Sequence, residues 1–393
     1  MSQTKAQLVS GTTAQDLTVD NINTTSINSG QPSGRRNLII NGAMYVAQRG
    51  TSSTDNGYQT VDRFSKNDNG TDEQATQSQV DVSSGTTPYT SGFRKAYRLT
   101  NGNQTSGAGS SDRVVIIYAV EAQDVVNSGW NYLSSSSFIT FSFWVKSSVA
   151  QNFYGRVQTQ DGTKYNYPFE TGSLTADTWT KITKTIPGNS NLQIDNDNGS
   201  GLHIEIIPFR GTATTGSVSL NAWGVYDSSV RVPDMTSTWY TTNDATFEVT
   251  GVQLEAGTTA TDFEHRSFAE ELALCQRYFQ SISRSSSTNS VDGTFAAGTC
   301  NDNASSGGIL QVMVRFQTTM RAVPTMTQSG TFSHHVSGVN VADTTLSFNQ
   351  AYIDGIKCTG TQTTFVSPDG SCGELISKYS DSSTAIIKAS AEL

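Results

Sequence analysis

Three tryptophans stand on the polar phase of their predicted strands, where they alternate with Ser, Thr, Asn or Lys: Trp144, Trp179 and Trp223. A tryptophan offers a broad apolar ring and one N–H donor, which suits contact with a sugar ring or with a partner surface. A bulge that shifts the phase by one residue would turn these rings inward, and another subunit could also cover them. The pattern therefore predicts either a glycan-binding face or a covered one, and both interpretations stay open.

The C-terminal part of the chain supplies a second set of candidates, His334, His335 and Tyr352, in surroundings rich in Gly, Ser and Asn. We predict loops there, and exposed loop residues are natural receptor contacts. Adjacent residues of an extended chain point in opposite directions, so His334 and His335 cannot easily share one metal ion. Completion of a metal site by other subunits on a symmetry axis remains an alternative.

Two further patterns carry charge but favour a structural role. The run Asp195–Gly199 places oxygen side chains at alternate positions before a glycine, as calcium loops do. No carboxylate follows until Glu205, so the closing ligand is missing and a solvated turn is predicted. His203 alternates with Glu205 on one predicted strand, which favours a surface pair.

Catalytic motifs are missing from the sequence. There is no G-x-S-x-G elbow and no Cys–His pair in a known local pattern. The four cysteines, Cys275, Cys300, Cys358 and Cys372, lack the spacing of a zinc site or a disulfide scaffold. We predict no catalytic residue, no metal, no cofactor, and reduced thiols.

Composition narrows the function classes further. Only 15% of the residues are charged and the net charge is −9, against roughly 25% charged in typical domains. A pI near 4.9 without a basic stripe argues against nucleic-acid binding. No apolar run reaches the roughly 20 residues of a membrane-spanning helix, so no membrane insertion is predicted. The first residues lack a signal peptide, which predicts assembly in a cytoplasm.

These side chains must be positioned by an all-β framework. Short apolar-polar alternations separated by polar turns predict an antiparallel sandwich of jelly-roll type over residues 37–266. The predicted strands are Asn37–Gln48, Phe93–Thr100, Arg113–Glu121, Phe138–Ser147, Phe153–Thr159, Trp179–Ile186, Leu202–Phe209, Ser217–Tyr226 and Thr246–Leu254. In the best of them, Ile139, Phe141, Phe143 and Val145 share one face.

A helix and a smaller domain follow. Ser267 and Glu270 form a capping box, which predicts a helix from there to about Ser281. Residues 267–290 are assigned to this helix and a Ser-rich linker, and residues 291–393 to a smaller C-terminal β domain. Its predicted strands are Val312–Phe316, Thr325–Thr331, Thr345–Phe348 and Thr384–Glu392.

Residues 1–36 contain few apolar side chains, so they cannot offset their own ordering entropy. We predict an extended segment that is either disordered or ordered by pairing with other chains.

Motifs at both ends of the predicted sandwich resemble a recurrent module of bacteriophage tail fibres and other virion fibre proteins. The matching residues are Asn37–Met44, Ala47–Gly50, Val61–Phe64, Phe247–Glu255, Thr261–Glu264, Arg266–Ser267, Glu270–Glu271, Cys275–Phe279 and Ala389–Leu393. The resemblance covers roughly residues 37–283. Two interior segments, Ser142–Lys146 and Thr178–Thr183, are similar to carbohydrate-binding jelly rolls.

The resemblance implies a homotrimeric fibre of a phage virion. Residues 1–36 would attach it to the tail or baseplate, and its C-terminal part would meet a glycan or protein of the host surface. Two alternatives remain: a head or neck fibre or decoration protein with a mainly architectural role, and a tail spike that degrades polysaccharide.

Overall fold

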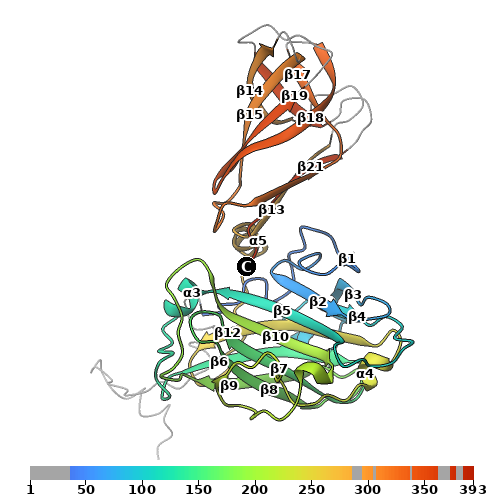
Figure 1. The fold of residues 1–393 in the computed structure, drawn as a ribbon, viewed down its shortest axis with the longest axis vertical. Coiled ribbons are helices and arrows are strands. Elements are labelled where there is room, and N and C mark those ends of the chain that lie inside the picture. The colour runs from blue at the N-terminus through green and yellow to red at the C-terminus, as the bar shows by residue number, and fades with distance from the viewer. Residues whose placement is uncertain (1–35, 286–293, 304–306, 337–338, 362–371, 378–383) are drawn as a thin grey trace, which may run out of the picture. The chain divides into compact units, whose positions relative to one another are not determined.

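A computed structural model describes residues 36–285, 294–303, 307–336, 339–361, 372–377 and 384–393 (Figure 1). The expected N-terminal segment, residues 1–36, lies outside these ranges except for its last residue. Residues 36–393 form one compact unit. All its named strands pair antiparallel, which confirms the predicted all-β class.

Two six-stranded sheets form the sandwich (Figure 1). The first sheet has, in spatial order, β1 Ser52–Ser53, β3 Thr76–Asp81, β4 Lys95–Thr100, β12 Thr246–Ala256, β6 Phe138–Ser147 and β9 Thr180–Pro187. The second sheet has β11 Gly224–Val225, β8 Tyr165–Ser173, β7 Asn152–Thr159, β10 Ser200–Arg210, β5 Arg113–Glu121 and β2 Phe64–Asn69.

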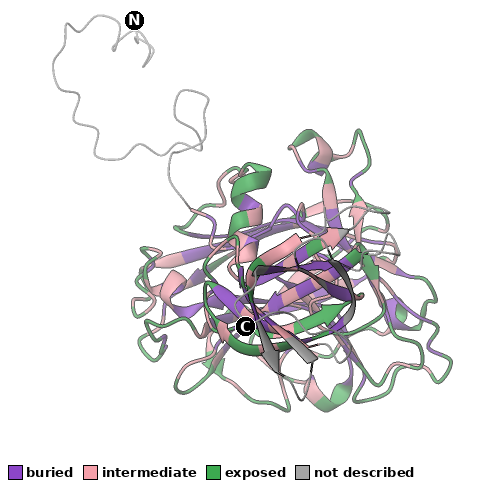
Figure 2. Cartoon of the chain, turned by 90° about the horizontal axis from the view of Figure 1, so that it is seen from above, coloured by how far each residue is buried: buried purple, intermediate pink, exposed green. Residues whose placement is uncertain are grey.

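The core lies between these sheets, and buried residues follow the strands while exposed ones follow the loops (Figure 2). The predicted inward face of β6 is confirmed, because none of its four apolar residues is more than 1% exposed. Phe141 packs against Phe169 of the other sheet with ring centroids 5.9 Å apart. Phe153 and Phe247 meet edge to face at 4.9 Å. Aromatic pairs of this geometry stabilise a core beyond the area that they bury.

The C-terminal part confirms the predicted small β domain. A closed barrel contains, in spatial order, β14 Thr294–Asn303, β15 Gly307–Arg315, β19 Gly355–Thr361, β18 Val339–Tyr352, β17 Phe332–Val336 and β20 Cys372–Ser377. A three-stranded sheet adds β13 Phe279–Ser285, β21 Thr384–Ser390 and β16 Thr325–Ser329. Closure removes unpaired strand edges.

Helices are few among the described residues: α2 Thr87–Thr90, α3 Ala122–Val126, α4 Thr238–Thr241, α5 Phe268–Gln276 and the 3₁₀ turn Thr212–Thr214. None of them is long and apolar enough to cross a bilayer. The capping box of Ser267 and Glu270 is present at α5 as predicted. The helix ends at Gln276 and not near Ser281, because residues 279–285 pair with β21. The expected Ser-rich linker therefore begins as strand.

The predicted strand Asn37–Gln48 is wrong, because this segment forms no strand. Asn41 has a left-handed φ of 63°, which Asn tolerates better than most residues. Its side chain accepts from Val46 N at 2.9 Å and donates to Asp62 O at 2.9 Å. Side-chain amides thus satisfy backbone groups that a strand would satisfy by a ladder.

The sequence patterns also overestimate one strand and miss three others. Only Gly224–Val225 of the predicted strand Ser217–Tyr226 pairs with β8, and the remainder is loop. The strands β2, β3 and β8 were not predicted, because their sequences are polar or contain Pro168. In β2 the buried Lys66 ammonium donates to Asp68 Oδ2 at 2.6 Å and to Ala75 O at 2.7 Å. Burial of such a residue is invisible to a hydropathy pattern.

The residues that resemble the fibre module come together in buried polar contacts. Glu264 accepts from the backbone N–H of Asn37 at 2.5 Å, and Glu271 of α5 accepts from that of Asn41 at 2.5 Å. Arg266 donates to Asn37 O at 2.6 Å. The opening and closing motifs therefore bind each other.

A second set of contacts holds the last described residues, and we call it the joint: Arg49, Arg63, Tyr278, Phe279 and Glu392. Glu392 accepts from Arg49 at 3.1 Å and also from Arg63. Each arginine lies 3.5 Å from an aromatic ring centroid, Arg49 over Phe279 and Arg63 over Tyr278. Arg63 is 1% exposed, so its charge depends on these partners.

We expect Arg63→Met to lower the free energy of unfolding by about 3 kcal/mol, because it removes one partner of a buried carboxylate. Chemical denaturation followed by tryptophan fluorescence measures the loss. The matched control is Lys95→Met, which breaks the exposed pair with Asp81 and should cost less than about 1 kcal/mol. Equal losses in both variants would contradict the role of the joint.

Candidate functional site

Trp144 lies on the outer face of the first sheet, as its phase predicts, and is partly buried. It stands opposite Thr250, where β12 carries an irregularity in register between Thr250 and Gln253. Gly251 has a φ of +61° there, and a Cβ atom on it would lie 3.0 Å from the Trp144 ring. The bulge and the glycine together make room for the ring on the outer face.

Trp179 packs against the same small cluster, just before the start of β9. The cluster is built on buried Ala43, Val82, Phe93 and Ala96. Around it, partly buried aromatic residues form a surface that we call the aromatic patch: Tyr45, Tyr89, Trp144, Trp179 and Phe263. The segment that follows β12 contributes to it, because Phe263 meets Phe93 edge to face at 4.9 Å.

Basic side chains border the aromatic patch. Lys146 Nζ lies 5.3 Å from the ring centroid of Trp179, and the Arg94 guanidinium lies 3.9 Å from that of Tyr89. Cations at such distances are attracted by the electron-rich ring face. Glu248 takes ion pairs from Arg98 at 2.6 Å and from Lys146 at 3.0 Å. The structure thus brings two of the three candidate tryptophans to one partly exposed, basic face.

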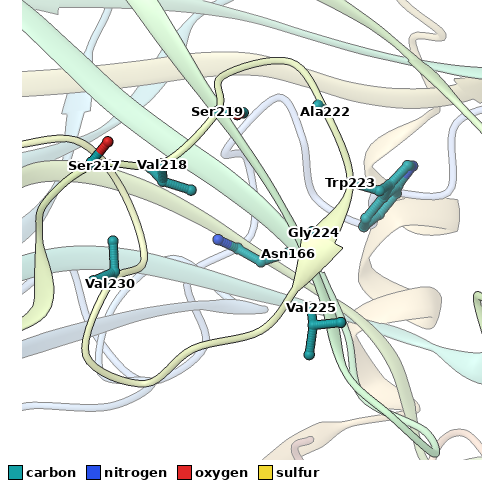
Figure 3. Close-up of a pocket in the computed structure, with 9 residues that line it drawn as sticks. All are labelled: Asn166, Ser217, Val218, Ser219, Ala222, Trp223, Gly224, Val225 and Val230. Carbon is teal, nitrogen blue, oxygen red and sulfur yellow. The ribbon is translucent and has the colours of Figure 1, made fainter.

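The third candidate, Trp223, lies elsewhere and has a structural partner. Its Nε1 donates to Pro187 O at 2.7 Å, and its ring lies 5.3 Å from Tyr167. It borders a pocket of about 360 Å³ (Figure 3), lined by Asn166, Ser217, Val218, Ser219, Ala222, Trp223, Gly224, Val225 and Val230. In Figure 3 the ring points away from Val218 and Val230. No charged side chain lines this pocket.

A buried charged network on the second sheet escaped sequence reasoning. Glu205 accepts from Arg156 Nε at 2.7 Å and from Arg210 at 2.9 Å. Arg156 also donates to Asn166 at 3.3 Å, and its guanidinium lies 5.3 Å from the ring of Tyr226. The expected surface pair of His203 and Glu205 is wrong, since Glu205 is 4% exposed.

Burial and charge set the protonation of this network. Burial alone would raise the pKa of Glu205, but Arg156 and Arg210 lower it to about 2. Burial lowers the pKa of the His203 imidazole to about 4, although Glu205 opposes this change. At neutral pH Glu205 is therefore ionised and His203 neutral. The only sequence signal was the alternation of two polar residues in an otherwise apolar strand.

The C-terminal candidates are not gathered at one place by any described contact. His334 and His335 lie in β17 and not in a loop, because they pair with Leu375 and Glu374 of β20. The side chain of His334 lies outside the described residues, and His335 Nδ1 is 3.9 Å from Glu374. Tyr352 at the end of β18 is 37% exposed, beside the exposed Ile353.

The described residues contain no group of three or more His, Cys, Asp and Glu that could hold a metal ion. Asp197 accepts from Gly199 N at 2.8 Å, so its carboxylate is used within its own turn. Cys275, Cys300 and Cys358 are buried and unpaired, and the Cys372 side chain lies outside the described residues.

Comparison with known proteins found no matching family model and no matching curated protein. Among solved structures, the chain is similar to the enzymatically active domain of tailspike protein 4 of bacteriophage CBA120, with 8% identity and a TM-score of 0.29. That match covers 56% of this chain and 21% of the tailspike chain, so this chain spans about a fifth of it.

Two smaller proteins match over nearly their whole length. A putative sugar-binding protein from Bacteroides thetaiotaomicron gives 11% identity and a TM-score of 0.30, covering 56% of this chain and 100% of that one. The N-terminal cellulose-binding domain of Cellulomonas fimi β-1,4-glucanase C gives 10% identity and a TM-score of 0.26. That match covers 55% of this chain and 99% of the domain. At these TM-scores none of the three likenesses carries an argument about function.

We expect Glu205→Gln to destabilise the protein at pH 7 by about 3 kcal/mol, because a pKa lowered from 4.5 to about 2 stabilises the fold by that order. The contribution is fully present above the unfolded pKa and is lost as the pH falls through the folded pKa. The difference between wild type and variant should therefore shrink to roughly half by about pH 3. Urea denaturation across this pH range checks the expectation, and a difference independent of pH would contradict it.

Proposed function

We propose that this chain is a fibre protein of a phage virion and that it binds a glycan of the host-cell surface. The aromatic patch carries the binding part of the proposal. Trp144 and Trp179 lie on one face of the first sheet, with a lysine over one ring and a small buried apolar cluster beneath. Partly exposed indole rings fixed in this way suit stacking against sugar rings, because rigid aromatics lose little entropy on binding.

The fibre part of the proposal is supported by the motifs at the two ends of the sandwich. These residues resemble virion fibre modules, and they are also the residues that close the sandwich and hold α5. In the proposed protein, residues 1–36 attach to tail or baseplate proteins, and the chain assembles in the bacterial cytoplasm before it joins the virion. The protein is structural and carries no enzymatic activity.

We propose the C-terminal barrel as a second binding surface, because the resemblance to fibre proteins implies that this part meets the host. Tyr352, the last residue of β18, and Ile353, in the turn before β19, are exposed there. The two alternatives for the whole chain, a head or neck fibre and a polysaccharide-degrading spike, predict different results. A head or neck fibre would label capsids and not tails in imaging of virions, and a spike would release reducing sugar from host polysaccharide.

We expect the double variant Trp144→Ala, Trp179→Ala to lose at least about tenfold in affinity for purified bacterial surface polysaccharides, since each lost stack removes on the order of 1 kcal/mol. Affinity gel electrophoresis with lipopolysaccharide and capsular polysaccharide panels measures this. Tyr352→Ala tests the second proposed surface, in the barrel, by the same measurement. Loss in the Tyr352 variant alone would transfer the binding to the barrel, and unchanged binding in both variants would refute the aromatic patch.

For the homotrimer, small-angle scattering should give a mass about three times the 42.2 kDa of one chain. Three identical chains would let residues 1–36 pair with partners and so offset their ordering entropy. Deletion of residues 1–36 is the control that separates assembly by this segment from assembly by the folded part. A mass near that of one chain for the full protein would contradict the trimer.

A further inference from the structure

On the outer face of β6 and β9, each of the two tryptophans has a lysine of the neighbouring strand beside it. Trp144 stands directly opposite Lys181 across the two strands. Two residues further along, Lys146 lies over Trp179, with 5.3 Å between Nζ and the ring centroid. Directly opposed side chains lie about 5 Å apart at Cβ and diagonal ones about 7–8 Å apart. Each indole ring thus has an ammonium group within one side chain's reach.

Positive charge exceeds negative charge on this face. Glu248 is shared by Lys146 and Arg98, so one carboxylate serves two cations. Lys181 is exposed, and no ion pair to it occurs among the described residues. The turn before β9 adds the exposed Asp177, whose backbone N–H is bound to Ser147 O at 2.7 Å. Around the two tryptophans, Lys146, Arg98 and Lys181 therefore outnumber the carboxylates of Glu248 and Asp177, in a chain whose net charge is −9.

We propose that the aromatic patch takes an acidic polysaccharide, one whose sugar rings carry carboxylates, as in hexuronic acids. This inference rests on the proposed glycan-binding function. A pyranose ring presents a C–H face that stacks on an indole, and a uronic acid places its carboxylate at the rim of the same ring. With the ring on Trp144, that carboxylate comes within reach of the Lys181 ammonium. A carboxylate would give the exposed Lys181 ammonium a charge-assisted bond, which is stronger than its bond to a neutral sugar hydroxyl.

The pocket beside Trp223 does not offer the same chemistry. Its lining contains serines, valines and one asparagine, and no cation. The Trp223 N–H is bound to Pro187, and Asn166 is engaged by Arg156 and by the Arg231 carbonyl. Arg156 and Arg210 of the second sheet are buried around Glu205, and Arg113 donates to Asn67. The aromatic patch on the first sheet is therefore the better site for a carboxylate ligand.

The test uses the full chain in affinity gels that contain polygalacturonate, alginate or hyaluronan, with methyl-esterified polygalacturonate and dextran as uncharged counterparts. We expect retardation by at least one acidic polymer, weaker retardation by its ester, and loss of most of the effect at about 0.5 M salt, where charges are screened. Lys181→Gln should weaken binding about three- to fivefold. Lys164→Gln, an equal change of charge on the loop between β7 and β8, should leave binding unchanged.

The outcomes separate the two proposals. Equal retardation by ester and acid, abolished by Trp144→Ala, would leave glycan binding standing and overturn the acidic class. No retardation by any acidic polymer would also overturn it. If acidic polymers retard the protein and neither Trp144→Ala nor Lys181→Gln changes the retardation, the aromatic patch is not the binding site and both proposals for it are wrong. Thermal unfolding of each variant shows that a loss of binding is not a loss of fold.

Discussion

The Glu392 carboxylate, held between two arginines of the sandwich, is the contact on which the arrangement of the described chain depends. Arg49 and Arg63 come from the segments before β2. The rings beneath them belong to Phe279, the first residue of β13, and to Tyr278, which lies between α5 and β13. Two ion pairs and two cation–π contacts therefore join three parts of the sequence at one place. The joint works because every charge in it has a partner, since an unpaired charge at that depth would cost several kcal/mol.

The same rule governs the other polar residues of the sandwich. Lys66 is fully buried and is satisfied by Asp68 and by two backbone carbonyls. Glu205 is surrounded by arginines that hold its pKa at about 2. Although the chain has few charged residues, several of them are buried in the sandwich, where they hold loops and turns against the sheets. Hydroxyls and amides are left to solvate much of the surface.

The aromatic patch differs from these networks in its exposure. Its rings pack on a small buried cluster but are only partly buried, and Lys181 stands opposite Trp144. Trp223 resembles the other two tryptophans in sequence but bonds to Pro187 and packs on Tyr167. Partly buried rings beside an exposed lysine are the features on which the proposal of a binding surface rests.

Period-two alternation by itself determined the strands that turn apolar side chains toward the core, and β5 and β6 begin and end at the predicted residues. It also determined the capping box of α5 and the outward phase of Trp144. The polar strands β2 and β3 could not be found, because their buried side chains are satisfied by partners that no local pattern reveals. The apolar pattern of Asn37–Gln48 predicts a strand, but in the structure the side chains of Asn37 and Asn41 accept from the backbone N–H groups of Ile39 and Val46.

Only the tertiary structure decided which charges are buried and which tryptophans share a face. Glu205 meets Arg156 from 49 residues away, and Glu392 meets Arg63 from 329 away. Trp144 and Trp179 meet because antiparallel pairing of β6 and β9 sets their register. Hydrophobic periodicity reports the face of one strand, whereas pairing between distant segments depends on the whole packed chain.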